Sequence, residues 1–182
     1  MSHQPDRTTA EPPVSAESPV TAAEPPALPD DLLRLDLQVC FALHAASRAF
    51  GGVYRRVLKK TELTYPQYLA MLVLWEHGEM PVKRLGEFLR LDSGTLSPLL
   101  KRMQSAGLVR RERSAQDERS VTVRLTAEGE ALRESAQGVP LQVIEASGLD
   151  PAELVDLRSR LRRLTAALDT ALGDEALTDE EG

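Results

Sequence analysis

Apolar residues recur every three or four positions along most of the chain, the spacing that places them on one face of an α-helix. Residues 32–57 follow this pattern throughout and predict one long helix. Residues 68–75 are almost entirely apolar and predict a buried helix, with Thr64 and Gln67 as a capping box ahead of it. Residues 82–89 predict a short amphipathic helix. Most of residues 32–89 are therefore expected to be helical.

The middle of the chain passes from helical spacing to the alternation of a strand. Asp92 can cap a helix whose apolar side chains again recur every three or four residues, and Gly107 can end it. Residues 108–113 and 119–125 are then separated by the polar run 114–118, and apolar and polar residues alternate in the second segment, so that the two segments predict a hairpin. Two helices followed by a hairpin predict a winged helix-turn-helix, in a fold that is mostly α with a small β-hairpin.

Two helix starts follow the hairpin. Thr126 can cap one helix, and the sequence Asp150, Pro151 and Glu153 is a strong start signal for the last one. That last helix carries a narrow row of leucines, Leu154, Leu157, Leu161, Leu164 and Leu168. Such a row suits pairing with another helix, and it also suits packing against the helix's own domain.

The formal net charge of −6 looks unfavourable for a protein that binds DNA, but the charge is unevenly distributed. Residues 1–31 hold one basic and six acidic residues, and residues 174–182 hold five acidic ones. The 21 basic and 17 acidic residues between these ends give that part a net charge of +4. The hairpin is crowded with arginines, at positions 110, 111, 113, 119 and 124. DNA binding and a solvated charged surface both fit this pattern.

Cysteine count and apolar runs exclude several classes of protein. The one cysteine cannot form an intrachain disulfide, and no cysteine or histidine cluster has the spacing of a metal site. No apolar run reaches about 18 residues, and no segment has the pattern of a signal peptide. These features favour a cytoplasmic protein without a metal or cofactor. Residues 1–30 carry seven of the twelve prolines and are expected to be disordered, with partner docking as the alternative.

Cys40 lies on an unusually polar row of the first predicted helix, which also holds His44 and Tyr54. A lone cysteine in a helix is most often a small, inert hydrophobic residue. On one straight helix Cys40 and Tyr54 would stand about 21 Å apart, because each residue advances the helix by about 1.5 Å. A contact between these two side chains would therefore require a second copy of the helix.

The sequence resembles the MarR-type transcription regulators, and among them the organic hydroperoxide regulators, from Leu35 to about Gln137. The resemblance rests on LTYPQYLAMLVLWEHGEMPVKRLGEFL, LDSGTLSPLLKRM and DERSVTVRLTAEG, and on a cysteine closely followed by an aromatic residue in the first helix. It implies a winged helix-turn-helix with a helical dimerisation region, in which the first and last helices clasp a homodimer. The implied parts are a disordered tail (1–30), a winged-helix domain (31–173) with a DNA-binding lobe (62–125) and dimerisation helices (31–60 and 126–173), and an acidic tail (174–182).

The resemblance also assigns a redox role to the cysteine. In the organic hydroperoxide branch, the cysteine that matches Cys40 is attacked by peroxide, and tyrosines of the partner subunit hydrogen-bond it. By motif these tyrosines correspond to Tyr54 and Tyr65, whose phenol groups would favour the reactive thiolate. His44 stands where a further tyrosine often occurs, so the peroxide sensitivity is expected to differ from that of typical members.

The same resemblance places the recognition helix, residues 93–103, in the major groove of DNA, with Pro98 inside the helix. The residues expected to contact bases or phosphates are Ser93, Thr95, Ser97, Lys101, Arg102, Arg110 and Arg119, with Arg119 of the wing in the minor groove. Asp117 is expected to position the wing, because a carboxylate beside phosphates would be repelled.

The sequence thus predicts a homodimeric repressor, without enzyme activity, that binds a pseudo-palindromic operator in double-stranded DNA. Oxidation of Cys40 by an organic hydroperoxide is expected to release it. Because the chain has no second cysteine, the lasting product is expected to be a mixed disulfide with a small-molecule thiol. Two alternatives stay open, a regulator that responds to a reversible phenolic ligand and a one-cysteine thiol peroxidase, which would not explain the basic wing.

Overall fold

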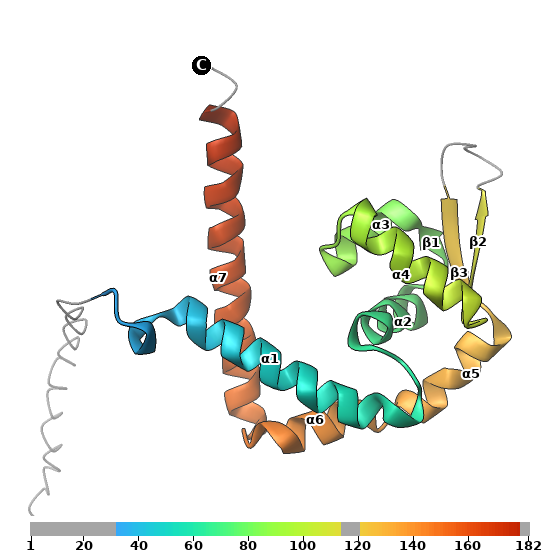
Figure 1. The fold of residues 1–182 in the computed structure, drawn as a ribbon, viewed down its shortest axis with the longest axis horizontal. Coiled ribbons are helices and arrows are strands. Elements are labelled where there is room, and N and C mark those ends of the chain that lie inside the picture. The colour runs from blue at the N-terminus through green and yellow to red at the C-terminus, as the bar shows by residue number, and fades with distance from the viewer. Residues whose placement is uncertain (1–31, 114–120, 179–182) are drawn as a thin grey trace, which may run out of the picture. The chain divides into compact units, whose positions relative to one another are not determined.

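The structure is a computed structural model that describes residues 32–113 and 121–178, with side chains up to residue 173. Figure 1 shows the arrangement of its helices and strands. In chain order the elements are η1 (Leu35–Leu37), α1 (Val39–Val57), η2 (Leu58–Lys60), α2 (Tyr65–His77), β1 (Met80–Pro81), α3 (Val82–Leu89), α4 (Ser93–Ser105), β2 (Val109–Arg113), β3 (Val121–Leu125), α5 (Ala127–Ala136), α6 (Val139–Ser147) and α7 (Pro151–Thr178).

The first predicted helix begins later than its apolar pattern suggested. Residues 35–37 form the short 3₁₀ helix η1, and Gln38 is extended, so that α1 starts at Val39 rather than at Leu32. Leu32, Leu35 and Leu37 are exposed, so burial among the described residues does not favour one continuous helical row there. The residues before Ala42 form a small unit of their own.

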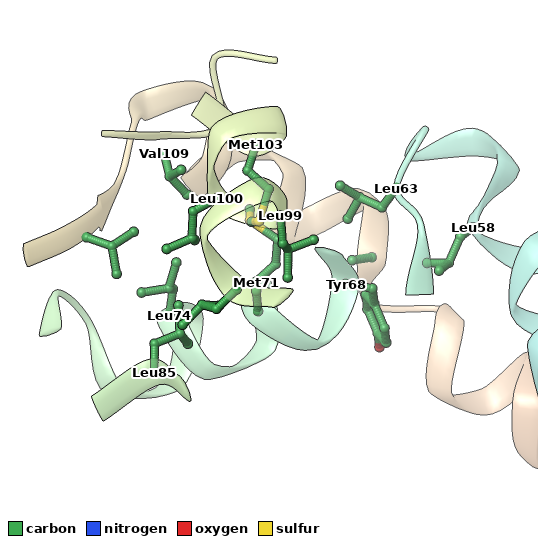
Figure 2. Close-up of a cluster of buried hydrophobic side chains, with 14 of the residues drawn as sticks. Leu58, Leu63, Tyr68, Met71, Leu74, Leu85, Leu99, Leu100, Met103 and Val109 are labelled. Carbon is green, nitrogen blue, oxygen red and sulfur yellow. The ribbon is translucent and has the colours of Figure 1, made fainter. Parts of the chain in front are cut away.

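The hydrophobic core lies where α2, α3 and α4 meet the sheet, as Figure 2 shows. Met71 and Leu74 of α2 face Leu100 and Met103 of α4, and Leu85 of α3 closes one side. All five side chains are buried, with exposed fractions of 1% or less. The nearly continuous apolar run in α2 is thus explained by burial on several sides.

The predicted hairpin is confirmed and is part of a three-stranded sheet in the order β1-β3-β2. β2 pairs antiparallel with β3, with Val109 opposite Leu125, and β1 pairs with the other edge of β3, with Met80 opposite Val123. Together, α3, α4 and the hairpin confirm the winged helix-turn-helix. The residues that join β2 to β3, with Asp117 and Arg119 among them, lie outside the described residues.

The helices after the sheet include one that the sequence pattern did not predict. α5 and α7 start where Thr126 and Asp150 predicted, whereas α6 was not predicted. α7 is 28 residues long and continues past residue 173, where we expected the helical domain to end. None of its described side chains is buried. No helix in the described ranges is long and apolar enough to cross a membrane.

Candidate DNA interface and redox site

Two well-defined ends fix the length of α4, the predicted recognition helix. At its start, the Asp92 carboxylate accepts hydrogen bonds from the backbone N–H and the hydroxyl of Thr95, each at 2.9 Å. These hydrogen bonds hold the pKa of Asp92 below its usual value. At its end, Gly107 adopts a positive φ of 74°, and Leu108 donates its N–H to the Met103 carbonyl at 3.0 Å, as in a Schellman motif.

The two faces of α4 differ in burial as the pattern predicted. Its apolar side chains, Leu96, Leu99, Leu100 and Met103, are buried in the core. The side chains that we expected to contact DNA are exposed, namely Ser93, Thr95, Ser97, Lys101 and Arg102. Pro98 lies inside the helix, also on the exposed side. Because proline lacks an N–H, the Gly94 carbonyl loses its usual helical donor there.

The arginines of the wing differ in whether other side chains of the protein bind them. Arg124 pairs with Glu112 across the strands at 2.8 Å, and this carboxylate raises the pKa of Arg124. Arg111 donates from Nε to the side-chain oxygen of Gln104 at 2.7 Å, which links the wing to the end of α4. Arg110, which we expected to contact DNA, is exposed opposite Arg124. Two wing arginines are thus held within the protein, which the charge pattern alone did not reveal.

Tyr54 and Tyr65, which the family motif paired, lie together where α1 meets α2. Their ring centroids are 4.3 Å apart, and the ring of Tyr68 is 5.9 Å from that of Tyr54. Burial, followed by the neighbouring Tyr65 and Tyr68, raises the pKa of Tyr54 to about 12. Burial also raises the pKa of Tyr65 and of Tyr68. The three phenols therefore keep their protons at neutral pH and can act as hydrogen-bond donors.

Sequence reasoning missed Tyr68 because it falls in the apolar run of α2 and was assigned to the core. Its ring is indeed buried, but its hydroxyl points away from the labelled core side chains in Figure 2. The second tyrosine in the sequence YPQY, three residues after Tyr65, was the available signal. Residues three apart in a helix lie on the same side of it.

The thiol of Cys40 is exposed, in the first turn of α1. It donates a weak hydrogen bond to the side-chain oxygen of Gln38, with Sγ and Oε1 3.9 Å apart. His44, one turn further along α1, is exposed as well. An accessible thiol can react with a small oxidant without any rearrangement of a core.

Comparisons with known proteins place these features in a family. Residues 52–135 match the family model described as "Transcriptional regulator SarA/Rot". The organic hydroperoxide resistance transcriptional regulator of Bacillus subtilis is 46% identical over 138 residues, which cover 76% of this chain and 94% of that protein. The chain belongs to the MarR family of transcription regulators, in its organic hydroperoxide regulator branch.

Two further relatives agree with this assignment. The regulator TtmR of Methylorubrum extorquens is 45% identical over 148 residues, which cover 81% of this chain and 76% of that protein. Reduced AbfR of Staphylococcus epidermidis bound to DNA matches with a TM-score of 0.67 and 32% identity, over 79% of this chain and 98% of that chain. AbfR has also been solved in an overoxidised form bound to DNA and in a disulfide form.

Proposed function

We propose that this MarR-family protein is a redox-sensing transcriptional repressor that leaves its operator when an organic hydroperoxide oxidises Cys40. The observation that carries the proposal is the 46% identity to an organic hydroperoxide resistance regulator over nearly that protein's whole length. An exposed thiol, the only one in the chain, supports it. This function also accounts for the exposed polar face of α4 and the basic wing.

DNA is bound by α4 in the major groove and by the wing in the minor groove. The contacts of α4 with DNA are made by Ser93, Thr95, Ser97, Lys101 and Arg102. Those of the wing are made by Arg110 and Arg119, and Asp117 positions the wing. The hydroxyl of Thr95 is already bonded to Asp92, so Thr95 is best suited to contact through its methyl group or its backbone. The exposed cations supply the salt-dependent attraction to phosphates.

A homodimer is the form that acts, since dimers are typical of the family. α7 exposes apolar side chains along its length, and Val155, Leu168 and Leu172 are more than half exposed. Such a row in an otherwise solvent-exposed helix needs a covering surface. A second copy provides it, and two copies related by a two-fold axis match a pseudo-palindromic operator.

The dimer also supplies Cys40 with phenol donors. Cys40 and Tyr54 are fourteen residues apart in sequence, so we assign the tyrosines at each thiol to the partner subunit. Tyr54 and Tyr65 donate hydrogen bonds that favour the thiolate, which is the form that attacks peroxides. His44, on the same helix as Cys40, adds a group that can tune this reactivity.

The oxidation proceeds in two steps. The Cys40 thiolate attacks the terminal oxygen of the hydroperoxide, forming an S–O bond and breaking the O–O bond, so that a sulfenic acid forms and the leaving alkoxide takes a proton from water to become an alcohol. A small-molecule thiol then attacks the sulfur, a mixed disulfide forms, and the sulfenic oxygen leaves as water. The chain offers no second cysteine to take the place of that thiol.

One experiment tests the proposed function. A DNA site is selected from a random pool with reduced protein, and an organic hydroperoxide is titrated into the complex of wild type and of Cys40→Ser, first alone and then with a small thiol present. Hydroperoxide alone should release little DNA, and the results that follow are those expected with the thiol. Wild type should dissociate near one equivalent per subunit, and Cys40→Ser should stay bound. Release of both proteins, or release only by a phenolic ligand, would favour a reversible ligand sensor. Continuous consumption of hydroperoxide with excess thiol would favour a peroxidase.

A second comparison tests the tyrosines. Tyr54→Phe and Tyr65→Phe should bind DNA like wild type but release it more slowly after hydroperoxide is added, because each lacks one donor to the thiolate. Tyr68→Phe removes the third phenol of the cluster and shows whether the effect is specific to the two tyrosines of the family motif, in which case it releases DNA at the wild-type rate. Equal release rates for all four proteins would leave Tyr54 and Tyr65 as packing residues only.

A further inference from the structure

The base of the wing is tied to the end of α4 by a set of hydrogen bonds that centre on Thr126. The Thr126 hydroxyl donates to the Gly107 carbonyl at 2.5 Å, and its backbone N–H donates to the Leu108 carbonyl at 3.1 Å. The same hydroxyl oxygen accepts the N–H of Gly129 at 3.0 Å, which caps α5. The end of the recognition helix, the last strand and the start of α5 therefore share one connection.

Gly129 brings α5 as close to this connection as the backbone allows. It is buried, and a Cβ atom built on it would lie 2.2 Å from the Leu108 carbonyl oxygen. No side chain fits in that space, because the obstacle is backbone rather than a flexible side chain. A small displacement of α5 must therefore move residues 107–108, and with them the end of α4.

Trp75 links α2 to Gly129 by a hydrogen bond. Its indole N–H donates to the Gly129 carbonyl at 3.0 Å, across 54 residues of sequence. Trp75 is the only tryptophan in the chain, and it lies about two to three helical turns along α2 from Tyr65 and Tyr68. One end of α2 thus carries the tyrosine cluster, and the other end is bonded to the start of α5.

A groove of about 520 Å³ beside Trp75 separates the rest of α2 from α5 and is lined by Tyr68, Leu72, Arg133 and Ala136 among others. The two helices are therefore not packed tightly along their whole length. The indole hydrogen bond therefore carries a large share of the relative placement of α2 and α5, and the close contact of Gly129 with Leu108 passes that placement on to the end of α4.

We propose that Trp75 and Gly129 form a joint that positions the recognition helix, and that oxidation of Cys40 releases DNA by disturbing this joint through α2. The second half of this inference rests on the proposed function. Trp75 and Gly129 are positioning residues that do not contact DNA. Coupling between distant sites needs such a contiguous set of contacts with more than one arrangement.

Tryptophan fluorescence of the wild-type protein tests the link to oxidation, because all the emission comes from Trp75. Hydroperoxide with a small thiol should shift the emission of wild type to longer wavelength in step with DNA release, as the indole loses its carbonyl partner. Cys40→Ser should show neither change. Full release of DNA with unchanged emission would overturn the role of the joint in oxidation. Absence of release would instead contradict the proposed function, and that half of the inference with it.

Variants of the reduced protein test the positioning role without any oxidation. Trp75→Phe keeps the aromatic ring but removes the N–H, and it should weaken DNA binding about fivefold, the value of one net hydrogen bond. Gly129→Ala should weaken it further. Glu76→Gln, an exposed change on the same helix, is the matched control and should bind like wild type.

All affinities are measured at a temperature at which circular dichroism shows each variant to be fully folded. Loss of DNA affinity by folded Trp75→Phe supports a positioning role, which lost stability alone would not produce. If folded Trp75→Phe binds DNA as wild type does, the joint does not position the recognition helix. Because this variant keeps a large aromatic side chain, the test stands even if Gly129→Ala does not fold.

Discussion

The phenol groups of Tyr54, Tyr65 and Tyr68 lie in one cluster, and their protonation decides how they can interact with a thiol. Burial raises the pKa of each above its ordinary value of 10.0. A phenol that keeps its proton donates a hydrogen bond and stabilises a thiolate, whereas a phenolate would repel one. The cluster thus holds its members in the form that the proposed chemistry requires.

Spectrophotometric titration of tyrosinate should show this directly, because the three tyrosines of the chain are the three members of the cluster. The folded protein should ionise last at about pH 12, and Tyr54→Phe should lack that last step. A tyrosine of the folded protein that titrates at its ordinary value of 10.0 would contradict the cluster.

The raised pKa of Tyr54 also makes the stability of the fold depend on pH. The folded state holds the Tyr54 proton more tightly than the unfolded state does, so its contribution to the free energy of unfolding is complete below pH 10.0. That contribution is lost as the pH rises toward about 12. Urea unfolding of wild type at pH values across this interval should show a steeper loss of stability than Tyr54→Phe.

At the level of single residues, the sequence indicated which side chains belong to the candidate site, but not which side chains they contact. Tyr54 and Tyr65 were assigned through a family motif, and the structure brings them together. The bonds of Arg111 to Gln104 and of Arg124 to Glu112 were not predictable, because they depend on the cross-strand register and on how α4 meets β2. The sequence of a basic hairpin does not reveal whether an arginine is hydrogen-bonded to a neighbouring side chain or is free to bind DNA.

Among the elements, α4 shows how local signals fix both ends of a helix. Asp92, Gly107 and Leu108 define its start and its end as predicted from their residue types. By local rules Pro98 would suit the first turn of a helix that starts after Ser97, but α4 starts at Ser93 and contains this proline because the Asp92 cap and core packing determine where the helix begins. A strong local breaker is thus overridden by the contacts of a whole element.

Substitution of Asp92 tests the cap. Asp92→Ala removes both acceptors for Thr95 and should lower the melting temperature and the DNA affinity of the protein, whereas Asp92→Asn keeps an oxygen and should retain most of both. In wild type, the contribution of the carboxylate is present above its unfolded pKa and is lost as the pH falls through its lowered folded pKa. Equal melting temperatures for the Ala and Asn variants would show that the side chain does not act as a cap.

Two elements escaped sequence reasoning for physical reasons. β1 has two residues, and only its pairing with β3, more than forty residues later, makes it a strand. α6 follows Gly138 and contains Pro140 near its start, a position where proline costs a helix nothing. The spacing of apolar residues does not reveal which distant strands pair. It also does not distinguish a proline that starts a helix from one that ends it.

On the scale of the whole molecule, α7 stands out because none of its described side chains is buried. A groove of about 850 Å³ runs beside it, lined mainly by apolar side chains such as Leu157 and Leu161. Arg90, in the turn between α3 and α4, pairs with Asp169 of α7 at 2.9 Å. This ion pair joins the turn before α4 to α7, so a change at the proposed dimer interface would have a route to the helix-turn-helix.

The dimer can be tested by placing a charge in this groove. Leu161→Asp should dissociate the proposed dimer, because it replaces an apolar side chain by a charged carboxylate that association would remove from water in both copies. Its affinity for a two-half-site operator should fall by about tenfold or more, since the half-sites would no longer be bound by linked lobes. Ser159→Asp, exposed on α7, adds the same charge and is the control. Sedimentation equilibrium that shows Leu161→Asp still dimeric would exclude this face as the interface.

The central claim is that oxidation of one thiol sets DNA occupancy, and one titration measures both quantities on the same sample. Limiting amounts of an organic hydroperoxide are added to the protein and DNA complex with a small thiol present. The released fraction is measured by anisotropy, and the oxidised fraction of Cys40 by intact mass. We predict that release rises in proportion to a single adduct on Cys40 and is complete when every thiol has reacted. Full modification of Cys40 with the DNA still bound, or release with the thiol unmodified, would contradict this account.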